Sequence, residues 1–229
     1  VLNRLAQTEE AKSLSTTKKR FLEKTLDDFR RHGAELSPAG KERLQAITRE
    51  LAELTSRFAQ NVLDATAAFE LVIEDESRLA GLPASAKEAA REAAKAKGLP
   101  GYRFTLHAPS YIPLMTYLDD AGLREKVWRA YDTRASFGAH DNRALVRRIL
   151  ELRKEKAHLL GFADFSDLVL ADRMAENGDR ASEFVHRLRQ RTEPYFEKEN
   201  EALEKLRAES GADQPMQPWD LAYWSEKQR

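Results

Sequence analysis

Apolar side chains recur every three or four residues through most of the chain, which is the spacing of an amphipathic helix. A first helix is expected up to about His32, where Gly33 follows in the position of a C-terminal cap. Ser37 as N-cap and Pro38 at the first helical position then open a second helix. Its apolar seam consists of Leu44, Ile47, Leu51, Leu54, Phe58 and Val62. Residues 2–66 are therefore predicted to form an antiparallel helical hairpin.

The apolar period changes from a helical one to a strand-like one over residues 67–108. Two short runs alternate between apolar and polar positions, with Phe69, Leu71 and Ile73 in the first and Tyr102, Phe104 and Leu106 in the second. Between them, residues 83–97 are rich in Ala, Lys and Glu and predict a polar surface helix that ends at Gly98. Residues 67–108 are thus predicted to hold a small two-stranded β ribbon and one surface helix.

Residues 109–229 are predicted to be helical throughout. The longest of these helices runs from Ala181 to Glu209, and Pro194 inside it predicts a kink or a break. Trp219 to Gln228 opens a last helix. The expected fold class is mainly α, a bundle-like lobe of long antiparallel helices with one small β ribbon.

Composition narrows the functional classes. Lys and Arg together number 38, as do Asp and Glu, so the zero net charge lacks the footprint of a nucleic-acid-binding protein. The chain has no Cys, which excludes disulfides, thiol nucleophiles and Cys-ligated metals and fits a reducing compartment. No apolar run approaches a membrane span, and the charged first twenty residues do not form a signal peptide. We therefore expect a cytoplasmic protein without a nucleic-acid or membrane partner.

Both ends of the sequence suggest a longer protein. The chain begins with Val1 and not with Met, and it ends at Arg229 inside a segment predicted to be helical. No Gly or Pro marks a stop before that end. We expect the chain to be a fragment.

Catalytic motifs are absent from the sequence. There is no G-x-S-x-G, no phosphate-binding G-x-x-x-x-G-K-[ST] and no G-x-G-x-x-G. H-E-x-x-H is absent as well, because Glu follows none of the five histidines, His32, His107, His140, His158 and His186. We predict that this chain contains no catalytic, cofactor-binding or metal-ligating residue.

Two E-x-x-H pairs leave one alternative open. Glu155 with His158 and Glu183 with His186 would each share a helix face, and di-iron carboxylate bundles use two such pairs. Glu is abundant in this sequence, so such spacings also arise by chance. The two pairs lie close along the chain, whereas bundles separate them by a further helix. We favour the interpretation without a metal.

An aromatic cluster near the end of the chain has two interpretations as well. Trp219, Tyr223 and Trp224 could form a ligand platform, but aromatic residues four apart on a helix more often pack in a core or between domains. Asp220 at the start of that helix would favour the helix dipole. If a neighbouring lobe is missing, an exposed apolar patch is expected near these three aromatic residues.

Six stretches in shared order resemble the M3 family of zinc metallopeptidases, of the oligopeptidase A and thimet oligopeptidase type. They are Leu36–Thr66 (LSPAGKERLQAITRELAELTSRFAQNVLDAT), Leu79–Gly98 (LAGLPASAKEAAREAAKAKG), Pro109–Tyr117 (PSYIPLMTY), Arg124–Ser136 (REKVWRAYDTRAS), Ile149–Ala175 (ILELRKEKAHLLGFADFSDLVLADRMA) and Gln217–Arg229 (QPWDLAYWSEKQR). The resemblance implies a two-lobed helical enzyme that hydrolyses short peptides in a channel between its lobes. Its H-E-x-x-H motif and third zinc ligand would lie downstream of this chain.

By this resemblance, residues 1–229 would be the helical N-terminal lobe of the peptidase. That lobe would wall the channel, pack against the missing catalytic domain, bind no zinc and be inactive alone, and the enzyme would be a monomer. The zinc-bound water would attack the peptide carbonyl in the other lobe. A non-enzymatic helical scaffold or protein-interaction module is the alternative. An H-E-x-x-H encoded beyond Arg229 would favour the peptidase.

Overall fold

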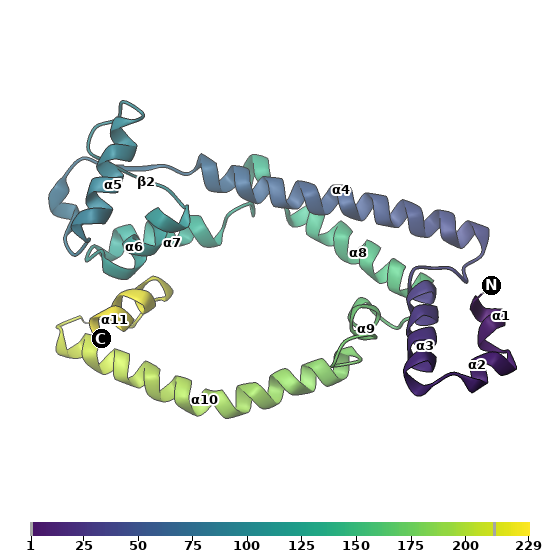
Figure 1. The fold of residues 1–229 in the computed structure, drawn as a ribbon. Helices are drawn as coiled ribbons and strands as arrows, with labels where there is room; N and C mark the ends of the chain where they lie inside the picture. Colours follow the sequence, from purple (N-terminus) through teal and green to yellow (C-terminus); the bar gives the residue numbers. More distant parts are fainter. Residues whose placement is uncertain (1, 213) are drawn as a thin grey trace. The chain divides into compact units, whose positions relative to one another are not determined.

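The chain folds mainly into α-helices with one small antiparallel β ribbon, which confirms the predicted fold class (Figure 1). The computed structural model describes residues 2–212 and 214–229. The helices there are α1 (Leu2–Ala6), α2 (Glu9–Ser13), α3 (Thr16–Arg31), α4 (Pro38–Ala68), α5 (Ala84–Lys95), α6 (Ala108–Tyr117), α7 (Ala121–Asp132), α8 (Arg143–Leu159), α9 (Phe165–Leu170), α10 (Gly178–Glu209) and α11 (Leu221–Lys227). Strands β1 (Leu71–Ile73) and β2 (Tyr102–Phe104) pair, and short 3₁₀ helices occupy Glu76–Leu79, Gly138–His140 and Pro218–Asp220.

Local capping explains why α3 ends and α4 begins where the sequence predicts. Gly33 adopts a φ of +82°, the left-handed conformation that ends many helices. Its N–H donates to the carbonyl of Arg30 at 2.8 Å, and the N–H of Ala34 donates to the carbonyl of Phe29 at 2.9 Å. These bonds satisfy carbonyls that the helix end would otherwise leave unpaired. The hydroxyl of Ser37 then accepts from the N–H of Gly40 at 3.2 Å, which caps α4.

Two compact units make up the chain. Unit 1 contains the residues up to Ser56 together with Leu145–Arg187, and unit 2 contains Arg57–Ala144 together with Leu188–Arg229. Helices α4 and α10 each contribute to both units. The division of the chain into parts ending at residues 66 and 108 stays a prediction.

In unit 1, the partner of α4 is α8. Arg43 of α4 donates two hydrogen bonds to Glu155 of α8, at 2.5 and 2.7 Å. About two turns further along α4, Glu50 accepts two hydrogen bonds from Arg148, at 2.6 and 3.0 Å. The numbers rise along α4 as they fall along α8, so the two helices run in opposite directions. Ile47 between these ion pairs has no exposed surface.

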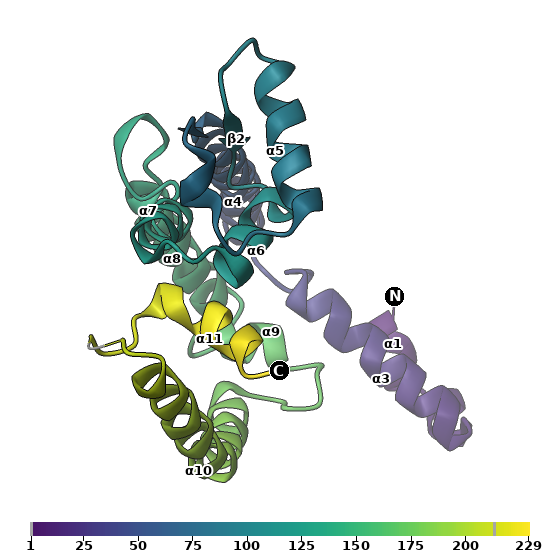
Figure 2. The same ribbon diagram turned by 90° about the vertical axis from the view of Figure 1, so that its left-hand side faces the viewer.

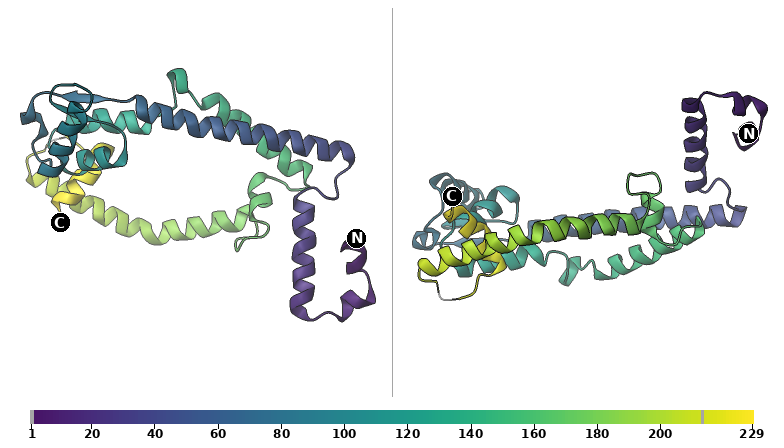
Figure 3. Two further views of the ribbon diagram at one scale, coloured as in Figure 1. Left: turned by 45° about the horizontal axis from the view of Figure 1, so that its top comes forward. Right: turned by 90° about the horizontal axis from the view of Figure 1, so that it is seen from below.

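Helix α3 does not accompany α4 in this way. It runs across the direction of α4, and α1 and α2 lie beside it instead (Figure 3). This arrangement differs from the antiparallel hairpin expected over residues 2–66. Of the apolar seam predicted for α4, Phe58 is 38% exposed and Ile47 is fully buried. The seam faces a helix about a hundred residues away in the sequence rather than its neighbour.

The ion-paired carboxylates Glu50 and Glu155 make the stability of unit 1 depend on pH. Hydrogen bonds from Arg148 and Arg43 lower the pKa values of Glu50 and Glu155 below the ordinary 4.5. A carboxylate whose pKa is lower in the folded state stabilises the fold at any pH above its unfolded-state pKa. This stabilisation is lost as the pH falls through the folded-state pKa. We expect the double variant Arg43→Gln, Arg148→Gln to melt below the wild type near pH 7 and to approach it as the pH falls below about 4.

Thermal melts followed by helical circular dichroism at each pH would measure this effect. Arg129→Gln is the matched control, because Arg129 pairs with Glu125 within the single helix α7. A gap between double variant and wild type that stays constant down to acid pH would contradict the assignment.

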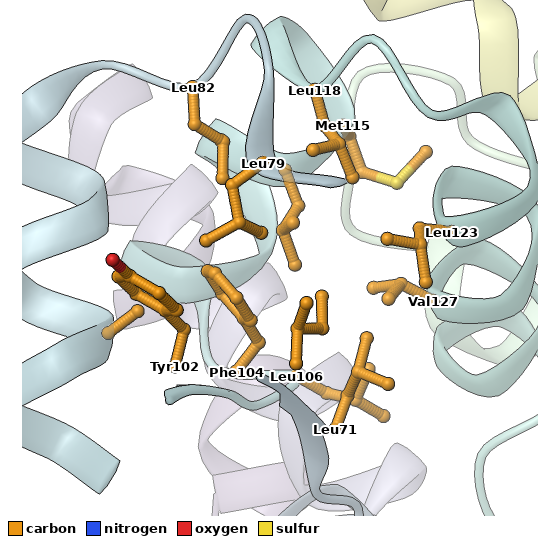
Figure 4. Close-up of a cluster of buried hydrophobic side chains, with 13 residues drawn as sticks. Leu71, Leu79, Leu82, Tyr102, Phe104, Leu106, Met115, Leu118, Leu123 and Val127 are labelled. Atoms are coloured by element: carbon orange, nitrogen blue, oxygen red, sulfur yellow. The ribbon is translucent and has the colours of Figure 1, made fainter. Parts of the chain in front are cut away.

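The hydrophobic core of unit 2 forms around the β ribbon (Figure 4). Leu71 pairs with Phe104 across the two strands, and both side chains are buried. Helix α5 packs beside β2 (Figure 2). The remaining buried members come from the strands themselves, from the segments beside them and from α5, α6 and α7: Ile73, Leu79, Leu82, Ala90, Tyr102, Leu106, Leu114, Met115, Leu118, Leu123 and Val127. The ribbon is therefore part of the core and not an addition to its surface.

Helix α10 continues unbroken through Pro194, so the break that the sequence allowed there does not form. Proline has no N–H, so this position cannot donate to the carbonyl of Gln190. The remaining hydrogen bonds of a 32-residue helix sustain it on both sides. Within residues 2–212 and 214–229, no helix is long and apolar enough to cross a membrane.

Candidate functional site

The first E-x-x-H pair is engaged in structural contacts. Glu155 forms the bidentate ion pair with Arg43, and this partner lowers the pKa of its carboxyl group. The Nε2 atom of His158 lies 2.9 Å from the carbonyl oxygen of Ala163, just beyond the end of α8. The pair therefore joins α8 to its neighbours, and neither side chain points toward a shared ligand.

The second pair lies on the surface. Glu183 and His186 are both exposed on α10, and Nδ1 of His186 lies 2.8 Å from the carbonyl oxygen of Ser182 in its own helix. Among the described residues, no three His, Asp or Glu side chains come close enough together to hold a metal ion.

The aromatic cluster near the end of the chain is a packing cluster. Tyr223 is buried, and Trp219 and Trp224 are half-buried. The rings of Trp219 and Trp128 lie 5.6 Å apart, and those of Tyr223 and Trp224 meet edge to face at 5.2 Å. Such tilted geometries stabilise aromatic pairs in cores. Of the two interpretations of this cluster, the structure supports packing.

A buried ion pair, which sequence reasoning missed, fixes this cluster to α7. The Nη2 atom of Arg124 donates to Oδ1 of Asp220 at 2.6 Å, and both side chains are more than nine-tenths buried. The same guanidinium donates to the carbonyl oxygens of Leu118, Asp119 and Trp219 at 2.6, 3.1 and 3.3 Å. These bonds satisfy a charge that burial would otherwise make very costly. One signal existed in the sequence, because Arg124 falls on the apolar arc of a predicted helix.

Tyr223 completes the arrangement as a hydrogen-bond donor. Its ring lies 4.1 Å from the guanidinium carbon of Arg124, and its hydroxyl donates to Oδ1 of Asp119 at 2.8 Å. Burial, and after it this hydrogen bond to a carboxylate, raises the pKa of the Tyr223 hydroxyl above its ordinary value of 10. Tyr223 therefore stays protonated at neutral pH and holds the last helix in place.

Exposed apolar side chains gather on α10, whereas the sequence led us to expect them near Trp219. Leu188, Tyr195 and Phe196 are 50%, 71% and 61% exposed. Residues seven or eight apart share a helix face, so these three form one row, which we call the α10 stripe. Leu203 continues the same row and is only 5% exposed. Among the described residues of unit 2, no other helix exposes as many large apolar side chains.

Comparison with known proteins identifies the family. The family model of peptidase family M3 matches residues 114–229, just over half of the 229 residues. The chain belongs to peptidase family M3. The matched M3 region runs from α6 to α11, so it contains Arg124, the aromatic cluster and the α10 stripe.

Individual M3 relatives cover nearly the whole chain. Oligopeptidase A of Haemophilus influenzae is 44% identical over 220 residues, which are 94% of this chain and 32% of that protein. Oligopeptidase A of Escherichia coli is 43% identical over 95% of this chain and 33% of that protein. Dipeptidyl carboxypeptidase of Escherichia coli is 32% identical over 97% of this chain. The resemblance seen in the sequence is thus confirmed, and the chain spans about a third of the length of these relatives.

Proposed function

We propose that this chain is the non-catalytic N-terminal lobe of a zinc-dependent metallo-oligopeptidase that hydrolyses short peptides. The observation that carries the proposal is the 44% identity to oligopeptidase A over 94% of this chain but only 32% of that protein. Zinc and its ligands would belong to the remaining two thirds. The peptide substrates, the monomeric state and the cytoplasmic location belong to the same proposal.

In this role the chain would form one wall of the substrate channel. A wall must hold its shape so that it can exclude water and limit which peptides enter. Long helices joined side to side by bidentate ion pairs suit that purpose, and α4 and α8 are joined in this way by Arg43 with Glu155 and by Arg148 with Glu50. Arginine and carboxylate groups in this fork geometry fix orientation as well as distance.

We expect the isolated chain to cleave no short peptide, with or without added zinc, because the nucleophile-generating metal and its general base would lie elsewhere. Fluorogenic peptides of five to ten residues would serve as substrates, with oligopeptidase A of Haemophilus influenzae as the positive control. Metal analysis of the dialysed chain is expected to find zinc well below one equivalent. Chelator-sensitive cleavage by the pure chain, at a rate unaffected by further purification, would overturn the proposal.

The alternative, a helical scaffold or interaction module without any enzyme, is distinguished by the coding sequence. If the reading frame continues beyond Arg229 into an H-E-x-x-H motif, the peptidase is supported. A stop codon directly after Arg229 would favour the scaffold.

A further inference from the structure

We propose that the α10 stripe is a docking surface, and that its occupant is the part of an M3 peptidase lying outside this chain. The inference rests on the proposed function and assigns the contact between the two parts to Leu188, Tyr195 and Phe196. These three side chains lie in unit 2, on the half of α10 that this unit contains.

The row to which the stripe belongs is covered at one end by this chain itself. Leu203 is 5% exposed and Arg207 is 6% exposed, and the N–H of Met216 donates to Oε1 of Glu204 at 3.0 Å. The segment after α10 therefore returns along its last turns. Toward the other end of the row, Tyr195 and Phe196 are 71% and 61% exposed. One face of α10 is therefore apolar along its length, and other parts of this chain bury only its C-terminal part.

Aromatic side chains give the stripe the composition of an interface centre. Tyr and Phe are enriched where protein surfaces meet, and they supply large contact area at low conformational cost. The flanking charges are of mixed sign, because Arg189 already donates to Glu193 at 2.9 Å before the aromatic pair and Lys198 lies between Glu197 and Glu199 after it. The occupant should therefore present an apolar centre with a polar rim of both charges.

A second copy of this chain is the rival occupant. Two α10 helices in opposite directions would also bring their apolar stripes together. The part of the same polypeptide outside this chain is favoured over a second copy, because it has the higher effective concentration. A segment of the same polypeptide is present at an effective concentration near the millimolar range, which exceeds that of a separate copy. The relatives have about twice as much chain outside the matched region as inside it.

The test places the stripe in a complete M3 protein. This chain replaces the matching 220 residues of oligopeptidase A from Haemophilus influenzae, to which it is 44% identical. The double variant Leu188→Glu, Phe196→Glu is compared with Met174→Glu, whose side chain is 98% exposed in unit 1. We expect the double variant to lower the yield of folded, active chimera by about tenfold or more, and the control to leave it unchanged.

The isolated chain provides the second measurement. There the double variant should unfold at the same urea concentration as the wild type, because its side chains are exposed. Equal behaviour of double variant and control in the chimera would overturn the proposal. A concentration-dependent dimer of the isolated chain that only the double variant abolishes, without loss in the chimera, would assign the stripe to a second copy instead.

The chimera also tests the proposed function separately from the docking surface. An unmutated chimera that folds but cleaves no peptide would contradict the proposed function, and the folded yields of the variants would still decide the docking surface. An unmutated chimera that does not fold would contradict the docking surface, because its two parts would then not fit.

Discussion

Replacing Arg124 by leucine is expected to lower the free energy of unfolding of unit 2 by about 3–5 kcal/mol, the range for removing one partner of a buried ion pair. The variant leaves the Asp220 carboxylate buried without its cation. It also removes the donors that serve the carbonyl oxygens of Leu118, Asp119 and Trp219. Leucine has no polar atom that could replace any of them. The 3₁₀ helix Pro218–Asp220 should detach first and α11 with it, because Arg124 donates to Trp219 and Asp220 in that 3₁₀ helix and lies 4.1 Å from the ring of Tyr223 in α11.

Urea unfolding followed by tryptophan fluorescence measures this effect in the correct unit. The three tryptophans, Trp128, Trp219 and Trp224, all belong to unit 2. Lys126→Leu is the matched control on the same helix, because Lys126 is exposed and the loss of an exposed charge should cost less than about 1 kcal/mol.

A second comparison separates the ion pair from the packing around it. The double variant Arg124→Leu, Asp220→Leu should recover a large part of the lost stability, because it leaves no uncompensated charge. If Arg124→Leu alone costs no more than Lys126→Leu, the buried ion pair does not hold the C-terminal segment.

Arg124 also shows where sequence patterns stop being informative. It lies on the apolar arc of α7 between Leu123 and Val127, both of which are buried. A charged residue at such a position can reach solvent along its own alkyl stem. Only a partner nearly a hundred residues later, Asp220, makes burial favourable. The pattern marks the position as unusual, but the identity of the partner depends on the tertiary fold.

The limits of the helices could be predicted because local groups set them. Gly33 and Ser37 each act through hydrogen bonds within five residues, so the sequence contains the whole cause. The pairing of α4 with α8 has no such local cause. It depends on Arg43 and Glu155, which are 112 residues apart, and a seam of apolar residues fits any complementary helix. The expected pairing with the preceding helix followed the chain order and missed this contact.

Coverage of an apolar face is equally hard to predict from spacing. Phe196 and Leu203 are seven residues apart on one face of α10 and share the same pattern, yet one is 61% exposed and the other 5%. The sequence placed the expected exposed patch at Trp219, Tyr223 and Trp224. Tyr223 is buried under Arg124, and Trp219 is half-buried against Trp128. The apolar spacing of a helix indicates which side chains favour burial. Whether they are buried depends on a second segment that packs against them.

Phe104→Ala is expected to lower the free energy of unfolding of unit 2 by about 3–5 kcal/mol, the usual cost of removing a buried aromatic ring. Phe104 is 3% exposed and lies opposite Leu71 in the ribbon. Two strands of three residues have little stability by themselves. They persist because their inward side chains belong to the core formed with α6 and α7, so removing the ring of Phe104 should weaken the helices as well.

The measurement again uses tryptophan fluorescence in urea, since Trp128 lies on α7 and packs against the same core. Phe21→Ala is the matched control, because Phe21 is 74% exposed in unit 1 and its loss should leave this transition within about 0.5 kcal/mol. Loss of the strands without a change in the Trp128 transition would mean that the ribbon is peripheral. A shift of the whole transition means that β1 and β2, although only six residues long together, hold the helices of unit 2 in one cooperative structure.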